Sequence, residues 1–200
     1  DPSLTHAIRP VDRLLGALSA TMIRGYADGV PPLRDALRSL CDADPSDAGA
    51  QRYQSWLWLA ARTAVGILDD ELAYRLAAAN VRVARTDGAL TGLASALNFH
   101  ANILALGGEL TRAGEMAGRS IAISESTGGV PMRHAETIVS AWRGDAVTVA
   151  RLQELTERDP GNPPEGAEAA LAAYATAVLH NALGEYEKAQ QAATITCACV

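Results

Sequence analysis

Aromatic and hydrogen-bonding side chains recur at matching distances before four predicted helix turns. The positions ten residues before these turns hold an indole, an amide, an imidazole and a phenol, and those six before hold a guanidinium, a second amide and the apolar side chains of Ile138 and Val178. Rings give flat apolar contact, while amides and Arg fix a ligand's orientation. We therefore expect these side chains to line a groove for a polar small ligand or a peptide. The predicted set is Trp58, Arg62, Asn98, Asn102, His134, Trp142, Tyr174 and Asn181.

Each of these residue types also has a plainer structural interpretation. Trp58, Trp142 and Tyr174 can pack between neighbouring repeats, because Trp in helical arrays is usually core. His100 and His180 are expected to be partly buried, hydrogen-bonded histidines rather than ligands. The segment 69–71, Asp-Asp-Glu, is expected to cap a helix N-terminus rather than to act as a catalytic carboxylate pair.

Catalysis, a cofactor and a metal are not expected in this segment. The spacing gives no Ser/His/Asp or Cys/His arrangement, no P-loop and no two His four residues apart. The three cysteines, Cys41, Cys197 and Cys199, are too few for a disulfide framework and indicate a reducing, cytoplasmic location. The chain is therefore predicted not to be an enzyme.

The charge and the hydropathy pattern restrict the partners. The 200 residues carry a net charge of −6, with Lys188 as the sole lysine, whereas a nucleic-acid binder normally carries a basic face. No run of 18 uncharged apolar residues is present, so we expect no membrane partner. The chain does not begin with Met, and we expect it to be a fragment of a larger protein.

The elements that must position the groove residues are helices. Apolar residues recur at spacings of three and four, and Gly- and Pro-containing turns separate the periodic runs. The segment 29–32, Gly-Val-Pro-Pro, is predicted to end one helix and open the next. We expect a single domain over 1–200, with helical hairpins at about 4–43, 47–88, 91–128, 131–159 and 165–200.

An internal repeat orders these hairpins into an array. Units of roughly 36–40 residues place small residues near each turn, at Ala61, Ala101 and Ala177 before it and at Ala73, Ala113 and Ala189 after it. Small residues let two antiparallel helices approach closely. The fold class expected is all-α, a right-handed superhelix of about five antiparallel helix pairs, in which the first helix of each pair lines the concave side.

Two sets of motifs resemble known families. The segment 184–189, Gly-Glu-Tyr-Glu-Lys-Ala, resembles a tetratricopeptide repeat. The segments 69–77, 83–90, 141–144 and 174–184 resemble the helical-repeat region of the large ATP-binding LuxR-type transcriptional regulators, which are similar in layout to the maltose-operon activator.

The resemblance implies a non-catalytic ligand- or protein-binding, sensing module of a cytoplasmic regulator. Groove occupancy would be coupled to domain arrangement or to self-association, the partner would be a small-molecule effector or a protein, and any ATP would bind the parent protein outside this segment. The alternative is a tetratricopeptide-like protein–protein scaffold of another signalling protein, such as a regulatory kinase.

Overall fold

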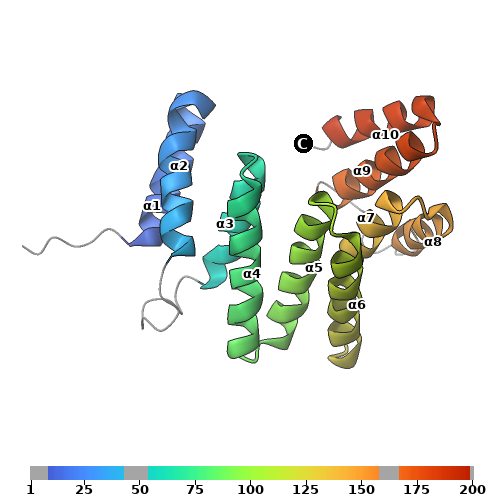
Figure 1. The fold of residues 1–200 in the computed structure, drawn as a ribbon, viewed down its shortest axis with the longest axis horizontal. Coiled ribbons are helices and arrows are strands. Elements are labelled where there is room, and N and C mark those ends of the chain that lie inside the picture. Colours follow the sequence, from blue (N-terminus) through green and yellow to red (C-terminus); the bar gives the residue numbers. More distant parts are fainter. Residues whose placement is uncertain (1–8, 43–53, 158–166, 199–200) are drawn as a thin grey trace, which may run out of the picture. The chain divides into compact units, whose positions relative to one another are not determined.

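The computed structural model describes residues 9–42, 54–157 and 167–198, and these form ten α-helices with no strand. The all-α prediction is confirmed for this part of the chain (Figure 1). The hairpin ends predicted near 43 and 159 and the residue Cys199 lie outside the described residues. In order, the helices are α1 (Pro10–Arg24), α2 (Tyr26–Cys41), α3 (Gln54–Gly66), α4 (Asp70–Thr86), α5 (Leu90–Leu106), α6 (Leu110–Ser126), α7 (His134–Trp142), α8 (Ala146–Glu157), α9 (Ala167–Ala182) and α10 (Tyr186–Ala198).

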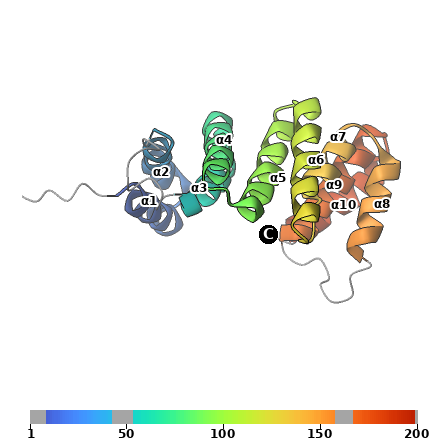
Figure 2. The same cartoon turned by 90° about the horizontal axis from the view of Figure 1, so that it is seen from below.

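The chain divides into two compact units, Asp1–Ala89 and Leu90–Val200. In the first unit α1 packs against α2 and α3 against α4. In the second, α5 packs against α6, α7 against α8 and α9 against α10. Figures 1 and 2 both show α5 and α6 side by side. The predicted pairing of consecutive helices is therefore confirmed, and a superhelix formed by all five pairs stays a prediction.

Alanine burial at the helix crossings agrees with the repeat analysis. Ala61, Ala73, Ala101 and Ala113 are fully or almost fully buried. Ala189 is buried as well, whereas its partner position in the last pair, Ala177, is half-buried. Because a methyl group adds little width, the axes of paired helices can approach until Leu side chains on the flanks fill the remaining space.

Six helix ends close with the same pair of backbone hydrogen bonds. After α5, the amide of Gly108 donates to the carbonyl of Ala105 (3.0 Å) and that of Glu109 to the carbonyl of Leu104 (2.9 Å). This Schellman arrangement requires a left-handed residue, and Gly108 has φ +81°. Matching bonds end α3, α4, α6, α7 and α9. Glycine holds the left-handed position everywhere except after α3, where Leu68 has φ +55° at a cost of about 1–2 kcal/mol.

The predicted helix break at 29–32 is wrong. The α1–α2 turn is instead at Gly25 (φ +84°), and α2 continues through Gly29, Pro31 and Pro32. The two prolines remove amide donors that would have bonded to the carbonyls of residues 27 and 28. Residues 27, 28, 31 and 32 are all exposed, so water can satisfy the freed carbonyls.

Helix α7 is the centre of the second unit. This nine-residue helix contacts α5, α6, α8 and α9. Five of its nine residues are buried: Ala135, Ile138, Val139, Ser140 and Ala141. The first helices of successive pairs thus pack in the order α5, α7, α9. Most of the stability of so short a helix must come from this packing, because an isolated helix of its length is unstable in water.

At Gly29 the helix α2 lies close against α1, and this contact leads to the first prediction. A Cβ built at Gly29 would lie 2.3 Å from the Cα of Thr21. We expect Gly29→Ala to lower the free energy of unfolding by about 1–3 kcal/mol, because the hairpin must separate to admit the methyl group. Urea unfolding followed by circular dichroism measures the change.

Gly16→Ala is the matched control, because nothing lies within 4 Å of a Cβ at Gly16 in α1. This variant should stabilise the chain by about 0.5–1 kcal/mol through helix propensity. Equal effects of the two substitutions would contradict the close approach at Gly29.

The α3–α4 turn is fastened to α2 by a carboxylate. Asp69 caps α4 by accepting from the amide of Leu72 (3.2 Å), and its other oxygen accepts from Arg34 Nε of α2 (2.7 Å). Burial by itself raises the pKa of Asp69, but the hydrogen bonds from Arg34 and Leu72 and the positive charge of Arg34 outweigh it, and the pKa is lowered from 3.8. The prediction that Asp69 is a helix cap is confirmed.

The lowered pKa of Asp69 predicts an acid-sensitive turn. The ionised carboxylate stabilises the fold above its unfolded pKa, and this contribution is lost as the pH falls from about 4 through the folded value. We therefore expect Asp69→Asn to be less stable than the wild type at pH 6 and to lose less stability between pH 6 and pH 3. Urea titrations across this range test the slope. Asp87→Asn, at the other end of α4, should leave the wild-type slope in place.

Candidate functional site

Two residues of the predicted set form an exposed pair on α3. Trp58 is 47% exposed, and the guanidinium carbon of Arg62, one turn later, lies 5.9 Å from the centre of its ring. This is cation–π distance. Among the described residues, no carboxylate pairs with Arg62. The pair thus offers an aromatic face and a positive charge to solvent, and Trp58 is not a core packing residue.

Asn98 has a different environment. It is 5% exposed, and its Oδ1 accepts a hydrogen bond from the amide of Ala135 (3.2 Å). Ala135 is the second residue of α7, and Arg133, at the N-cap, makes no side-chain cap. A side chain of α5 therefore supplies the cap that α7 lacks in its own sequence. Ile138, six residues before the turn that follows α7, is also buried. Asn98 and Ile138 therefore do not face an open groove.

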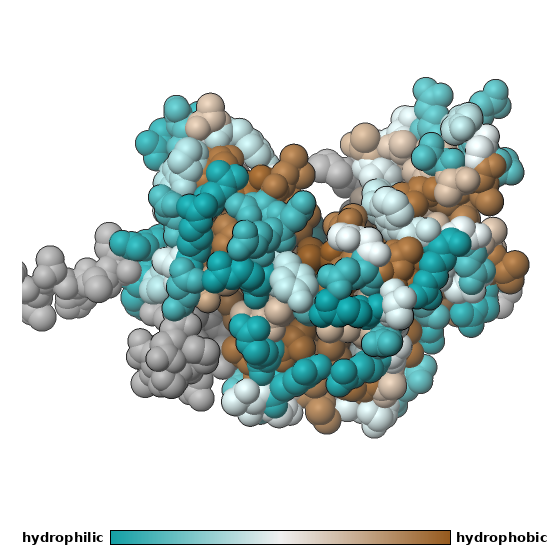
Figure 3. Space-filling view, viewed as in Figure 1, coloured by the Kyte–Doolittle hydropathy of each residue, from teal (hydrophilic) through white to brown (hydrophobic). Residues whose placement is uncertain are grey.

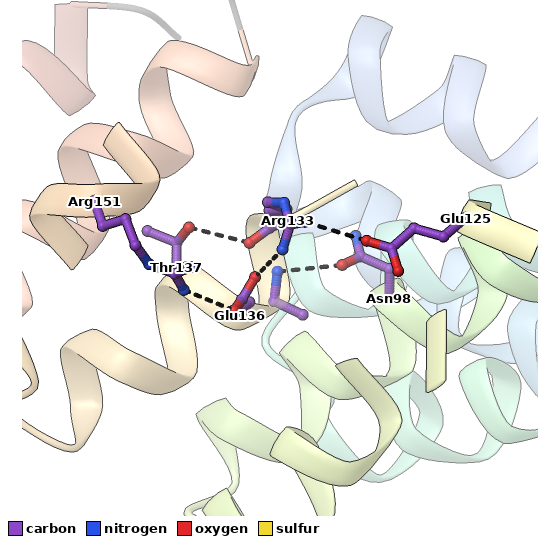
Figure 4. A network of polar contacts seen from close by, with 7 residues as sticks. Asn98, Glu125, Arg133, Glu136, Thr137 and Arg151 are labelled. Carbon is purple, nitrogen blue, oxygen red and sulfur yellow. Dashed lines mark hydrogen bonds and ion pairs between the residues drawn. The ribbon is translucent and has the colours of Figure 1, made fainter. Parts of the chain in front are cut away.

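A network of ion pairs surrounds the start of α7 (Figure 4). Arg133 bonds to Glu136 of α7 (2.7 Å) and lies 3.5 Å from Glu125 of α6. Glu136 is also 3.5 Å from Arg151 of α8. The two cations and two carboxylates balance in charge and tie α6, α7 and α8 together. Because Arg151 and Glu125 are largely exposed, the outer pairs add little stability, and the network chiefly orients the helices.

The remaining predicted residues are spread over α5, α7 and α9. Asn102 is half-buried, and its Oδ1 is fully buried with no hydrogen-bond donor among the described residues. His134, the first residue of α7, and Tyr174 of α9 are half-buried. Trp142 is 44% exposed at the end of α7, and Asn181 is exposed near the end of α9. The contacts of α7 with α5 and α9 bring these three helices together.

The two other histidines among the described residues occupy structural positions. His100 is buried in α5. His180 is half-buried, and its Nδ1 lies 2.6 Å from Glu185, which also accepts from Lys188 (3.1 Å). Hydrogen bonds from Lys188 and from His180 lower the pKa of Glu185. The prediction of a partly buried, hydrogen-bonded His180 is confirmed.

Sequence reasoning missed the network at α7. The spacing of Arg133 and Glu136 at i, i+3 was a usable signal for that one pair. No sequence signal connects Glu125 or Arg151 to them, because those contacts depend on how α6 and α8 pack. The exposed Leu68 in its left-handed turn was also missed, although the repeat alignment places it opposite Gly108.

Figure 3 shows apolar and hydrophilic residues intermixed over the face that it draws. In the described part of the chain, no helix combines the length and the hydropathy needed to cross a bilayer. Over the same ranges, no three His, Cys, Asp or Glu side chains gather in a way that could hold a metal ion. Burial raises the pKa of the Cys41 thiol, with smaller opposing effects from nearby arginines.

Comparison of the chain with protein-family models, with curated proteins and with solved structures finds no match. The structure itself defines the class of molecule, over the described residues, as an all-α protein of paired helices.

The cap donated by Asn98 generates a prediction. Asn98→Ala leaves the Ala135 amide buried without its acceptor, and we expect the free energy of unfolding to fall by about 1–3 kcal/mol. Thermal unfolding followed by circular dichroism measures this loss. Asn181→Ala, an exposed amide removed from α9, should change stability by no more than about 0.5 kcal/mol. Similar melting temperatures for both variants would show that the Asn98 contact does not stabilise α7.

Proposed function

We propose that this chain is a non-catalytic binding module, in which the exposed faces of first helices capture a small-molecule effector or a protein partner. The observation that carries the proposal is the pair of Trp58 and Arg62. Keeping a Trp ring half in water forgoes part of the roughly 1.5–3 kcal/mol that full burial of a large apolar side chain provides. Such a cost is expected where the ring has a partner to meet.

The chemistry of the pair indicates the kind of ligand. The ring offers apolar stacking area, and the guanidinium offers up to five N–H donors in one plane. A ligand that carries both a flat apolar group and a carboxylate or phosphate would match both side chains.

The parent protein that we propose is a cytoplasmic LuxR-type transcriptional regulator, in which occupancy of the module changes domain arrangement or self-association. The support is the resemblance of the segments 69–77 and 174–184, together with the helix pairs that the structure forms there. The alternative is a tetratricopeptide-like scaffold of another signalling protein, such as a regulatory kinase. The exposed rings of Trp142 and Tyr186 favour it, because protein interfaces are enriched in such residues.

A thermal-shift screen with carboxylate- and phosphate-bearing aromatic metabolites tests the proposal. A ligand of the module should raise the melting temperature of the wild type, and Trp58→Ala should abolish the rise while the unliganded variant still unfolds cooperatively. The shift should survive in Val147→Ala, which alters an exposed apolar residue of α8 outside the predicted set.

The outcomes separate the two functions. A shift that persists in Trp58→Ala would place the ligand elsewhere and contradict the proposed site. Absence of any small-molecule shift, combined with a purified protein partner whose binding depends on Trp58, would favour the scaffold.

A further inference from the structure

Leu68 breaks a rule that the other equivalent turns obey. Six helix ends share one hydrogen-bond arrangement, and Leu68 is the sole non-glycine with positive φ among the described residues. The side chain is also 86% exposed, so it gains no burial within the described fold. Leu68 thus has both a strained backbone conformation and an apolar side chain in water. Because neither feature stabilises the fold, the residue indicates a role in binding.

Tyr26 is fixed against the turn that holds Leu68, and two further exposed apolar side chains lie just before it, at the end of α1. The hydroxyl of Tyr26 donates to the carbonyl of Gly66 (3.0 Å), which fixes the start of α2 against the turn that holds Leu68. Tyr26 is 63% exposed, and Met22 and Ile23, at the end of α1, are 88% and 83% exposed. We call Met22, Ile23, Tyr26 and Leu68 the turn edge. It is formed within the first unit by the α1–α2 and α3–α4 turns.

The charges that flank the turn edge are mainly acidic. Asp28 follows Tyr26 in the first turn of α2, and Asp70 and Glu71 follow Leu68 in the first turn of α4. All three are exposed and form no ion pair with the described residues, although the helix N-termini favour their negative charge. Arg24 is the one cation of the described segment 22–28, and Arg34, beside the α3–α4 turn, is neutralised by its ion pair with Asp69. The edge therefore combines apolar anchors with a net negative rim.

We propose that the turn edge docks a basic amphipathic segment of a partner protein, whose apolar side chains cover Leu68, Tyr26, Met22 and Ile23 and whose Lys or Arg residues meet Asp28, Asp70 and Glu71. Charge complementarity selects this occupant. A second copy of the chain would bring the same acidic rim against itself, and an anionic membrane would be repelled as well. This inference is independent of the groove proposed above, because it uses none of the predicted groove residues.

Fluorescence anisotropy with a labelled amphipathic helical peptide of Leu and Lys tests the inference, alongside a peptide of the same pattern in which Glu replaces Lys. We expect the Leu/Lys peptide to bind the wild type at least tenfold more tightly than the Leu/Glu peptide. Binding should weaken at least tenfold in Leu68→Gly, even though this variant relieves the left-handed strain and keeps or raises the melting temperature. The double variant Met22→Ser, Ile23→Ser should weaken it as well.

Controls distinguish the turn edge from general attraction to an acidic protein. Val130→Ser removes an apolar residue that is equally exposed but lies in the other unit, and it should leave the affinity within twofold of the wild type. Asp70→Asn with Glu71→Gln should weaken binding at least threefold and reduce its dependence on salt.

Three outcomes would overturn the proposal. They are failure of the Leu/Lys peptide to bind more tightly than the Leu/Glu peptide, unchanged affinity in Leu68→Gly, and a dimer of the wild type in analytical ultracentrifugation that depends on Leu68 while the Leu/Lys peptide does not bind. The last outcome would assign the edge to a second copy of the chain.

Discussion

The structure depends on one repeated constraint: each helix must stop within a few residues and return against its partner. A left-handed residue and two backbone hydrogen bonds accomplish this at six helix ends, as at Gly108. The return brings Ala101 and Ala113 to the crossing, where their small side chains allow close approach. The turn chemistry and the burial of alanine thus support each other, because a wider turn or a larger side chain would separate the helices and expose the flanking leucines.

A second constraint acts on α7, which is too short to be stable alone and lies at the centre of its unit. Asn98 of α5 caps its first turn, and Arg133, Glu136 and Arg151 join it to its neighbours. The polar atoms near this helix are therefore largely committed to structure. On the exposed faces and edges, by contrast, Trp58, Arg62 and the turn edge keep apolar and charged groups in water.

The two proposed surfaces differ in the physical reason for their existence. At Trp58 the signal is a large ring left half exposed and paired with a cation that lacks a carboxylate among the described residues. At the turn edge the signal is the left-handed backbone conformation of Leu68, because glycine occupies this conformation at the equivalent turns. Helical pairs tolerate both kinds of departure, because their stability comes from the buried faces and leaves turns and outer faces open to selection for binding.

The sequence by itself determined the helical class, the positions of most turns and the alanines at the crossings, because these follow from periodicity, from glycine at left-handed positions and from local capping such as that of Asp69. It misplaced the first turn, since Gly29 and two prolines look like a break, yet Gly29 serves a close helix approach. The tertiary structure decided which polar residues are committed to the fold. Asn98 and Trp58 occupy equivalent places in the repeat, but one is buried as a cap and the other faces solvent. The reason is that burial depends on which helix packs against a given face, and a single helix's sequence does not contain that information.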